Sequence, residues 1–253
     1  MATPESESFV RTFARGLRVI EVMGQSAGKQ SIAELSDAAE LPRTVVRRLL
    51  LTLIELGFVK SDERSYWLTP KVLRLGMSYL HTLPFWRHSQ MVLEELGAKI
   101  KQSCAVSVLD DEDIVYIQRF HAKSIMAISP STGSRFPAYA VSMGRVLLSG
   151  LEPAQLKSYL AKIELKKLTP HTVTSKDKLL KSIIRARELG YAWIDSEVDE
   201  SICGLSVPVR DQDGAVIAAI NVSLLSGEYS EQQAVSEFLT KLRLTASQLR
   251  ARV

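Results

Sequence analysis

Four side chains that can contact DNA stand together at the start of one predicted helix. They are Arg43, Thr44, Arg47 and Arg48, with Val45 between them. Arginine can form two hydrogen bonds with guanine or bind a phosphate, and the methyl groups of threonine and valine can contact thymine. The same charges also suit a helix face that meets only water. The cluster alone therefore leaves DNA binding and simple exposure open.

The helix that carries this cluster is predicted to run from Pro42 to Leu56. Proline suits its first position because the missing N–H would have no partner there, and Gly57 suits a left-handed end. Apolar residues recur at steps of three and four, which predicts one inward stripe and outward arginines. The stripe consists of Val46, Leu49, Leu50, Leu53 and Leu56.

The flanking segments supply the other parts of a winged helix-turn-helix. A short helix from Ser31 to Ala39 begins with a capping-box pattern, Ser31 followed by Glu34. Apolar residues 58–59 and 66–68 bracket a polar tip, which predicts two short strands. With this context the chain is expected to bind DNA. Lys60 and Arg64 of the tip are expected to hold phosphates.

Length and composition limit the remaining possibilities. A chain of 253 residues can hold two modest domains. The net charge is only +4, and residues 1–81 hold eleven Lys/Arg against nine Asp/Glu, so global charge is weak support for a nucleic-acid partner. Cys104 and Cys203 are far apart and no apolar run could cross a bilayer, while residues 3–8 do not resemble a secretory signal. A cytoplasmic protein without a membrane partner is expected.

We predict three parts: a winged helix-turn-helix domain over 8–69, a linker helix over 70–83 and an α+β effector-binding domain over 84–253. The first domain should open with a helix over 13–23 that turns Phe13, Leu17 and Ile20 inward. In the last domain, helices are predicted over 85–102, 142–149, 153–163, 176–189 and 230–251. Strands are predicted over 105–109, 115–120, 125–129, 191–198, 205–210 and 215–225. The Asp213-Gly214 pair predicts a hairpin between the last two strands.

Two segments of this domain could form a ligand site. On the last strand, Asn221 and Ser223 share a face that becomes small and polar, as either a ligand pocket or a half-exposed sheet would require. On the strand over 191–198, alternation places Asp195 and Glu197 on one face, and we favour a solvated edge for Glu197 and for Glu200. The other segment is the loop over 129–145, rich in Gly, Ser and Pro. It feeds a helix expected to begin near Ala140 or Ser142, where free N–H groups can hold an anion.

Arg135 in that loop can bind a carboxylate with two hydrogen bonds, or it can be an ordinary surface arginine. Catalysis is not expected, because the four histidines are dispersed and no cysteine has a metal-ligand neighbour at suitable spacing. No nucleophile elbow, phosphate loop or dinucleotide fingerprint occurs. We therefore expect no enzyme activity, no metal and no cofactor.

The chain resembles the IclR family of bacterial transcription regulators from about residue 10 to the end. The likeness is carried by residues 13–20, 41–59 and 137–148, together with Gly190-Tyr-Ala and Ser206-Val-Pro-Val-Arg-Asp. The runs over 8–17 and 133–137 look most like the branch that senses protocatechuate or 4-hydroxybenzoate and regulates aromatic-catabolism genes. The alternative is a repressor that responds to a non-aromatic keto or sugar acid.

The resemblance implies a GAF-like effector domain, a small organic acid as effector, and a homodimer or dimer of dimers on double-stranded operator DNA. Gly204 stands where relatives often carry Cys or Ser, with Cys203 one place earlier, and this departure is expected to leave room in the pocket. Thr44-Val45 replaces a common Ser-Thr pair, and Leu51 replaces a polar residue and is expected to face a partner. The candidate effector contacts are Gly133, Arg135, Ser142, Asp195, Cys203, Gly204, Asn221 and Ser223.

Overall fold

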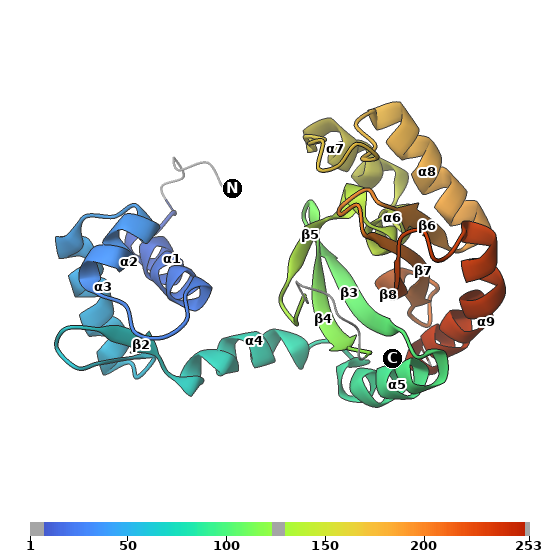
Figure 1. Cartoon of the computed structure of the whole chain (residues 1–253). Coiled ribbons are helices and arrows are strands. Elements are labelled where there is room, and N and C mark those ends of the chain that lie inside the picture. Colours follow the sequence, from blue (N-terminus) through green and yellow to red (C-terminus); the bar gives the residue numbers. More distant parts are fainter. Residues whose placement is uncertain (1–7, 123–129, 251–253) are drawn as a thin grey trace. The chain divides into compact units, whose positions relative to one another are not determined.

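The computed structural model describes residues 8–122 and 130–250 of the chain (Figure 1). The chain divides into two compact units, 1–82 and 83–253. The strand predicted over 125–129 falls outside the described residues.

The first unit contains the helices and wing that the sequence predicts. Its helices are α1 (Arg11–Gln25), α2 (Ile32–Ala39) and α3 (Arg43–Glu55), and its strands are β1 (Val59–Ser61) and β2 (Tyr66–Leu68). The strands pair antiparallel. The Ser31–Glu34 capping box is present, and Gly57 has a left-handed φ of 78° directly after α3. The winged helix-turn-helix is confirmed.

The core of the first unit differs from the predicted core at two places, the end of α3 and the first half of α1. Val46, Leu49, Leu50 and Leu53 of α3 are buried against α1 and α2, but Leu56 is 51% exposed. Leu56 lies at the end of the helix, where the chain turns and Val59 fills the core instead. The inward placement of Phe13 and Leu17 was also wrong, because they are 67% and 42% exposed. On α1 the buried stripe is set by Val19, Val22 and Met23, and Ile20 is only partly buried.

A short helical segment follows the wing. Its parts are η1 (Pro70–Val72) and α4 (Leu73–Leu80), within the predicted linker. No residue of either part is buried in one chain, although Leu73, Leu75 and Met77 are apolar.

The second unit is built on one antiparallel sheet whose strand order is β5-β4-β3-β8-β7-β6. Its β5 (Arg135–Pro137) was predicted as loop; the other strands match predicted strands with shifted ends, and the hairpin at Gly214 is confirmed. The strands are β3 (Ser103–Asp110), β4 (Asp113–Phe120), β5, β6 (Ala192–Asp195), β7 (Ile202–Arg210) and β8 (Val216–Leu225). The helical elements are α5 (Trp86–Ile100), η2 (Ala138–Ala140), α6 (Ser142–Ser149), α7 (Pro153–Lys162), α8 (Lys176–Leu189) and α9 (Glu231–Arg250).

Helices cover both faces of this sheet (Figure 1). On one face α5 meets β3, where the Cys104 thiol donates to the Leu93 carbonyl at 3.5 Å, and α9 packs beside α5. On the opposite face lies α6, in which every residue is buried between the sheet and α8. Gly144 permits this packing, because a Cβ there would lie 2.0 Å from the Ala138 carbonyl oxygen. The α+β fold is confirmed, and the start of α6 is fixed above the middle of the sheet.

Candidate DNA-binding surface and effector pocket

The leading turns of α3 present an uncompensated positive surface. Arg43, Thr44, Arg47 and Arg48 are exposed, and Val45 is half-buried against the core of the first unit. Within the described part of the chain, none of these three arginines forms a salt bridge. The buried leucines beneath them hold the guanidinium groups outward, as a groove-reading helix requires.

The wing is held in shape by charges at its base. Asp62 accepts from Lys29 Nζ at 2.6 Å and from the Ser65 N–H at 2.9 Å, and the bond from Lys29 is the main reason that the pKa of Asp62 lies below its ordinary value. Lys29 Nζ also lies 4.4 Å from the centre of the Trp67 ring. Lys60 and Arg64 remain exposed. Both can therefore reach a phosphate.

The floor of a pocket in the second unit is a row of residues across four strands, β4, β3, β8 and β7. Arg119 pairs with Ala105, Ala105 with Asn221, and Asn221 with Ser206. Residues directly opposite in a sheet point to the same face. Ser206 Oγ lies 2.7 Å from Ser142 Oγ on α6, so this face is the one that α6 covers.

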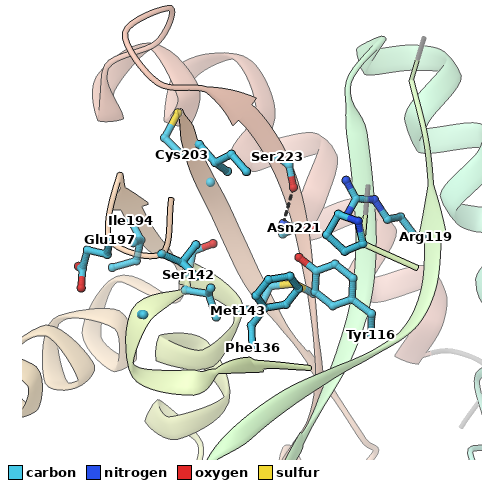
Figure 2. Close-up of a pocket in the computed structure, with 16 residues that line it drawn as sticks. Tyr116, Arg119, Phe136, Ser142, Met143, Ile194, Glu197, Cys203, Asn221 and Ser223 are labelled. Carbon is cyan, nitrogen blue, oxygen red and sulfur yellow. Dashed lines mark hydrogen bonds between the residues drawn. The ribbon is translucent and has the colours of Figure 1, made fainter. Parts of the chain in front are cut away.

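The pocket itself is a cavity of about 580 Å³, counting the space at its open mouth. Figure 2 shows Tyr116 and Arg119 toward one side of it, Ile194, Ser142 and Glu197 toward the other, and Phe136 and Met143 between them. The Tyr116 and Phe136 ring centres are 5.5 Å apart. The complete lining is Tyr116, Arg119, Pro130, Phe136, Ala140, Val141, Ser142, Met143, Ile194, Glu197, Val198, Ile202, Cys203, Gly204, Asn221 and Ser223.

Hydrogen-bond donors point into this cavity. Asn221 Oδ1 accepts from the Ala105 N–H at 3.0 Å, which fixes the amide and directs its Nδ2 group to Ser223 Oγ at 3.0 Å (Figure 2). Val141 begins α6 without a side-chain cap. The first N–H groups of a helix have no intrahelical acceptor and favour an anion. The pocket therefore suits a small ligand that carries acceptor oxygens.

Five of the eight candidate effector residues line this pocket: Ser142, Cys203, Gly204, Asn221 and Ser223. The structure does not bring Gly133, Arg135 and Asp195 to it. Gly133 lies in a turn with φ of 89° and donates its N–H to the Tyr116 carbonyl at 2.7 Å. Arg135 is exposed and bound to Asp110 and, at 3.1 Å, to Asp113. Asp195 is exposed and accepts from Ser226 Oγ at 2.7 Å.

The expectation that Gly204 leaves room needs correction. A Cβ at this position would lie 3.0 Å from Ser142 Oγ and 3.3 Å from the Val222 carbonyl oxygen. The space that glycine opens is therefore already used by the close approach of α6 to the sheet. The small side chain serves packing at the pocket floor.

Sequence alternation missed Tyr116 and Arg119, although both lie on a predicted strand. The two are three positions apart, which in a regular strand would place them on opposite faces. Between them β4 has a bulge: Val106 pairs with Gln118 and the next residue, Ser107, pairs with Tyr116, so Ile117 is left without a partner. A bulge inserts one residue and changes the side on which the following side chains lie. Tyr116 and Arg119 consequently share the pocket face.

The solvated edge favoured for Glu197 was wrong. Glu197 is buried, and its Oε2 accepts from Arg145 Nη2 at 2.9 Å and from the Val173 N–H at 3.1 Å. Arg145 is itself 0% exposed, and its Nε donates to the Tyr139 carbonyl at 2.7 Å. Burial raises the pKa of Glu197 and lowers the pKa of Arg145, since it disfavours both charges. Alternation failed because Ser196 has a φ of 59°, which turns the chain after β6.

Two other kinds of feature are absent from the described residues. Over 8–122 and 130–250, no three His, Cys, Asp or Glu side chains gather as a metal ion would need. Over the same ranges, no helix is both long and apolar enough to span a membrane.

Both units match known families. The IclR helix-turn-helix domain matches residues 12–63, and the bacterial transcriptional regulator IclR C-terminal domain matches residues 77–251. The chain belongs to the IclR family. This membership confirms the resemblance seen in the sequence, and the protein is a DNA-binding transcriptional regulator.

Individual relatives place this IclR-family chain more closely. It is 36% identical to the Pca regulon regulatory protein of Pseudomonas putida, over 91% of this chain and 80% of the relative. It is 31% identical to the p-hydroxybenzoate hydroxylase transcriptional activator of Acinetobacter baylyi, over 97% of this chain and 92% of the relative. Both support the Pca/Pob branch. The crystal structure of a putative transcriptional regulator from Rhodococcus sp. RHA1 has a TM-score of 0.85 and 38% identity, over 96% of this chain and 98% of that one.

Proposed function

We propose that this regulator is controlled by a small aromatic acid of the protocatechuate or 4-hydroxybenzoate type, which binds in the pocket above Asn221 and Ser223. The observation that carries the proposal is the composition of that pocket. Its sheet floor and the start of α6 supply hydrogen-bond donors, and Tyr116 and Phe136 supply two aromatic faces. Aromatic side chains pack favourably against another aromatic ring, such as that of the ligand.

The names of the two relatives agree with an aromatic effector, since one is a regulatory protein of the Pca regulon and the other is a transcriptional activator for p-hydroxybenzoate hydroxylase. A small keto or sugar acid is the alternative. It would use the same donors, but it would leave the apolar groups of Phe136, Met143 and Ile194 without a partner. The aromatic acid is the better match because it fills both kinds of surface.

Operator DNA is proposed to meet the exposed face of α3. Arg43, Thr44, Arg47 and Arg48 would enter the major groove, and Lys60 and Arg64 of the wing would bind the backbone. Val45 would add an apolar contact with its exposed part. Effector binding would then change operator affinity by the same factor by which DNA changes effector affinity. A regulator of this kind acts where the chromosome lies, and we therefore propose that it is cytoplasmic.

A homodimer is proposed because both α1 and α4 leave apolar side chains uncovered within one chain, with Phe13 and Leu73 the most exposed. Large contiguous apolar surfaces commonly mark interfaces. Sedimentation velocity should give the mass of two or four chains. Leu73→Asp should shift the distribution toward one chain, since no residue of α4 contributes to the core of its own unit. A wild-type monomer at micromolar concentration would contradict the proposal.

Titration calorimetry tests the effector. The panel should contain protocatechuate, 4-hydroxybenzoate, benzoate, pyruvate and gluconate, with each ligand recovered afterwards and analysed by chromatography. The aromatic acids are expected to bind, to raise the melting temperature and to be recovered unchanged, as a regulator without enzyme activity requires. Binding of pyruvate or gluconate alone would favour the alternative effector. Chemical conversion of any ligand would contradict the non-enzyme part of the proposal.

A further inference from the structure

We infer that Arg119 binds the carboxylate of the effector and thereby makes a negative charge, rather than an aromatic ring alone, the requirement for binding. The inference rests on the proposed function, because it assigns a role within the same pocket. It also gives the effector an orientation. The carboxylate would lie at the Arg119 and Tyr116 side, the ring beside Phe136 and Met143, and the ring hydroxyl toward Ser142 (Figure 2).

The bulge in β4 is what brings Arg119 to the pocket. Its paired neighbour Ala105 has a side chain too short to cover the sheet between Arg119 and Asn221. The floor is therefore open from the guanidinium group to the Asn221 amide. Both groups can reach one ligand.

Arg119 has no counter-ion within the described residues. Its Nε–H is buried and has no hydrogen-bond partner there, and no carboxylate lies within salt-bridge distance. Burial lowers the pKa of Arg119, which means that the positive charge is poorly solvated, although arginine stays protonated. A carboxylate bound there would give the buried N–H an acceptor and would give the poorly solvated guanidinium group a counter-ion.

Other arginines of this unit show the contrast. Arg135 has Asp110 and Asp113, and Arg145 has Glu197. Arg119 instead has the ring of Tyr116, with its Cζ 5.7 Å from the ring centre. This contact can hold the guanidinium plane while leaving its N–H edge free for a ligand. Tyr116 lines the same pocket, so its hydroxyl can donate to the same carboxylate.

A matched ligand pair separates the charge from the ring. 4-Hydroxybenzoate and 4-hydroxybenzamide have nearly the same shape, but only the first is an anion. Wild-type protein is expected to bind the acid roughly tenfold to a hundredfold more tightly than the amide, as hydrogen bonds to charged groups usually give. Arg119→Gln should bring this ratio close to one, mainly by weakening the acid. Arg119→Lys should keep an intermediate ratio, because it keeps the charge without the paired geometry.

Arg135→Gln is the matched control, since it removes an arginine of the same unit that the structure places outside the pocket. It should leave the acid-to-amide ratio at the wild-type value. Melting curves of all variants show whether each is folded, and Arg119→Lys carries the test if Arg119→Gln is not. A wild-type ratio in either Arg119 variant would overturn the inference while leaving the effector proposal intact. Failure of wild-type protein to bind the acid, or any other aromatic acid, would overturn the proposed function itself.

Discussion

Arginine stands in opposite surroundings in the two units of this molecule. On α3, Arg43, Arg47 and Arg48 lie in water without a counter-ion in the described chain. In the second unit, Arg145 is fully buried against Glu197, and the buried Nε–H of Arg119 has no partner among the described residues. Exposed charges are available for a large, strongly charged partner such as DNA. A poorly solvated charge in a cavity selects a small ligand instead.

The arginines of the two units also differ in how far along the chain the residues lie that determine their surroundings. The arginines of α3 are placed by helical periodicity, so residues within one or two turns determine their exposure. Arg145 depends on Glu197, 52 positions later. Arg119 depends on pairing with β3 and on a bulge. A change in Arg145 or Arg119 should therefore affect the fold or the pocket, whereas a change on α3 should affect DNA binding alone.

The largest expected effect comes from Arg145→Met. Removing one member of a buried pair leaves Glu197 charged and without its main partner, which typically costs about 3–5 kcal/mol of unfolding free energy. Denaturation by guanidinium chloride, followed by circular dichroism, measures this loss. Arg135→Met is the control, because it breaks exposed ion pairs that usually contribute at most about 1 kcal/mol. Equal losses in the two variants would mean that burial does not distinguish the two sites.

Arg47→Ala tests the exposed arginines of α3 and should affect DNA binding. Loss of a base or phosphate contact is expected to weaken operator binding by about 1–3 kcal/mol, which is roughly tenfold to a hundredfold. Effector affinity and unfolding free energy should stay at the wild-type values, because Arg47 is exposed and lies in the first unit. Fluorescence anisotropy with labelled operator and calorimetry with effector measure the two affinities.

Arg185→Ala is the matched control for Arg47→Ala. It removes an exposed arginine from the second unit, where Arg185 binds Glu231 at 2.8 Å. Operator affinity should not change in this control. If Arg47→Ala reduced effector and operator binding equally, the division of labour between the two units would have to be abandoned.

The sequence predicted best where one element determines its own structure. The bounds of α8 match the predicted helix, and the period-two pattern of β8 placed Asn221 and Ser223 in the pocket. It failed at three places where the chain departs from regular geometry or pairs over a long range. The sequence did not predict that the bulge at Ile117 brings Arg119 to the pocket, or that Glu197 is buried after the turn at Ser196. It also did not predict that Asp110 and Asp113 bind Arg135 outside the cavity.

The smallest expected effect concerns the capping box that begins α2 and so supports the DNA-reading helix. Ser31 Oγ accepts from the Glu34 N–H at 3.3 Å and donates to the Glu34 carboxylate at 2.9 Å. Ser31→Ala should lower the stability of the first unit by about 1 kcal/mol. Trp67 is the only tryptophan in residues 1–82, so its fluorescence in a Trp86→Phe, Trp193→Phe background reports this unit during urea denaturation.

Glu34 gives the same cap a pH dependence whose sign is fixed. The Ser31 backbone N–H donates to the Glu34 carboxylate at 2.7 Å, and this bond, followed by that of the Ser31 hydroxyl, holds the pKa of Glu34 below its ordinary value of 4.5. The stabilisation is therefore complete above the ordinary pKa and is lost as pH falls through the lower, folded value. Glu34→Gln keeps an acceptor oxygen but cannot ionise. Wild type should thus be more stable than Glu34→Gln near neutral pH, and the difference should vanish in acid. A difference that stayed constant with pH would show that the ionised carboxylate contributes nothing specific to the cap, and that α2 is positioned by its packing alone.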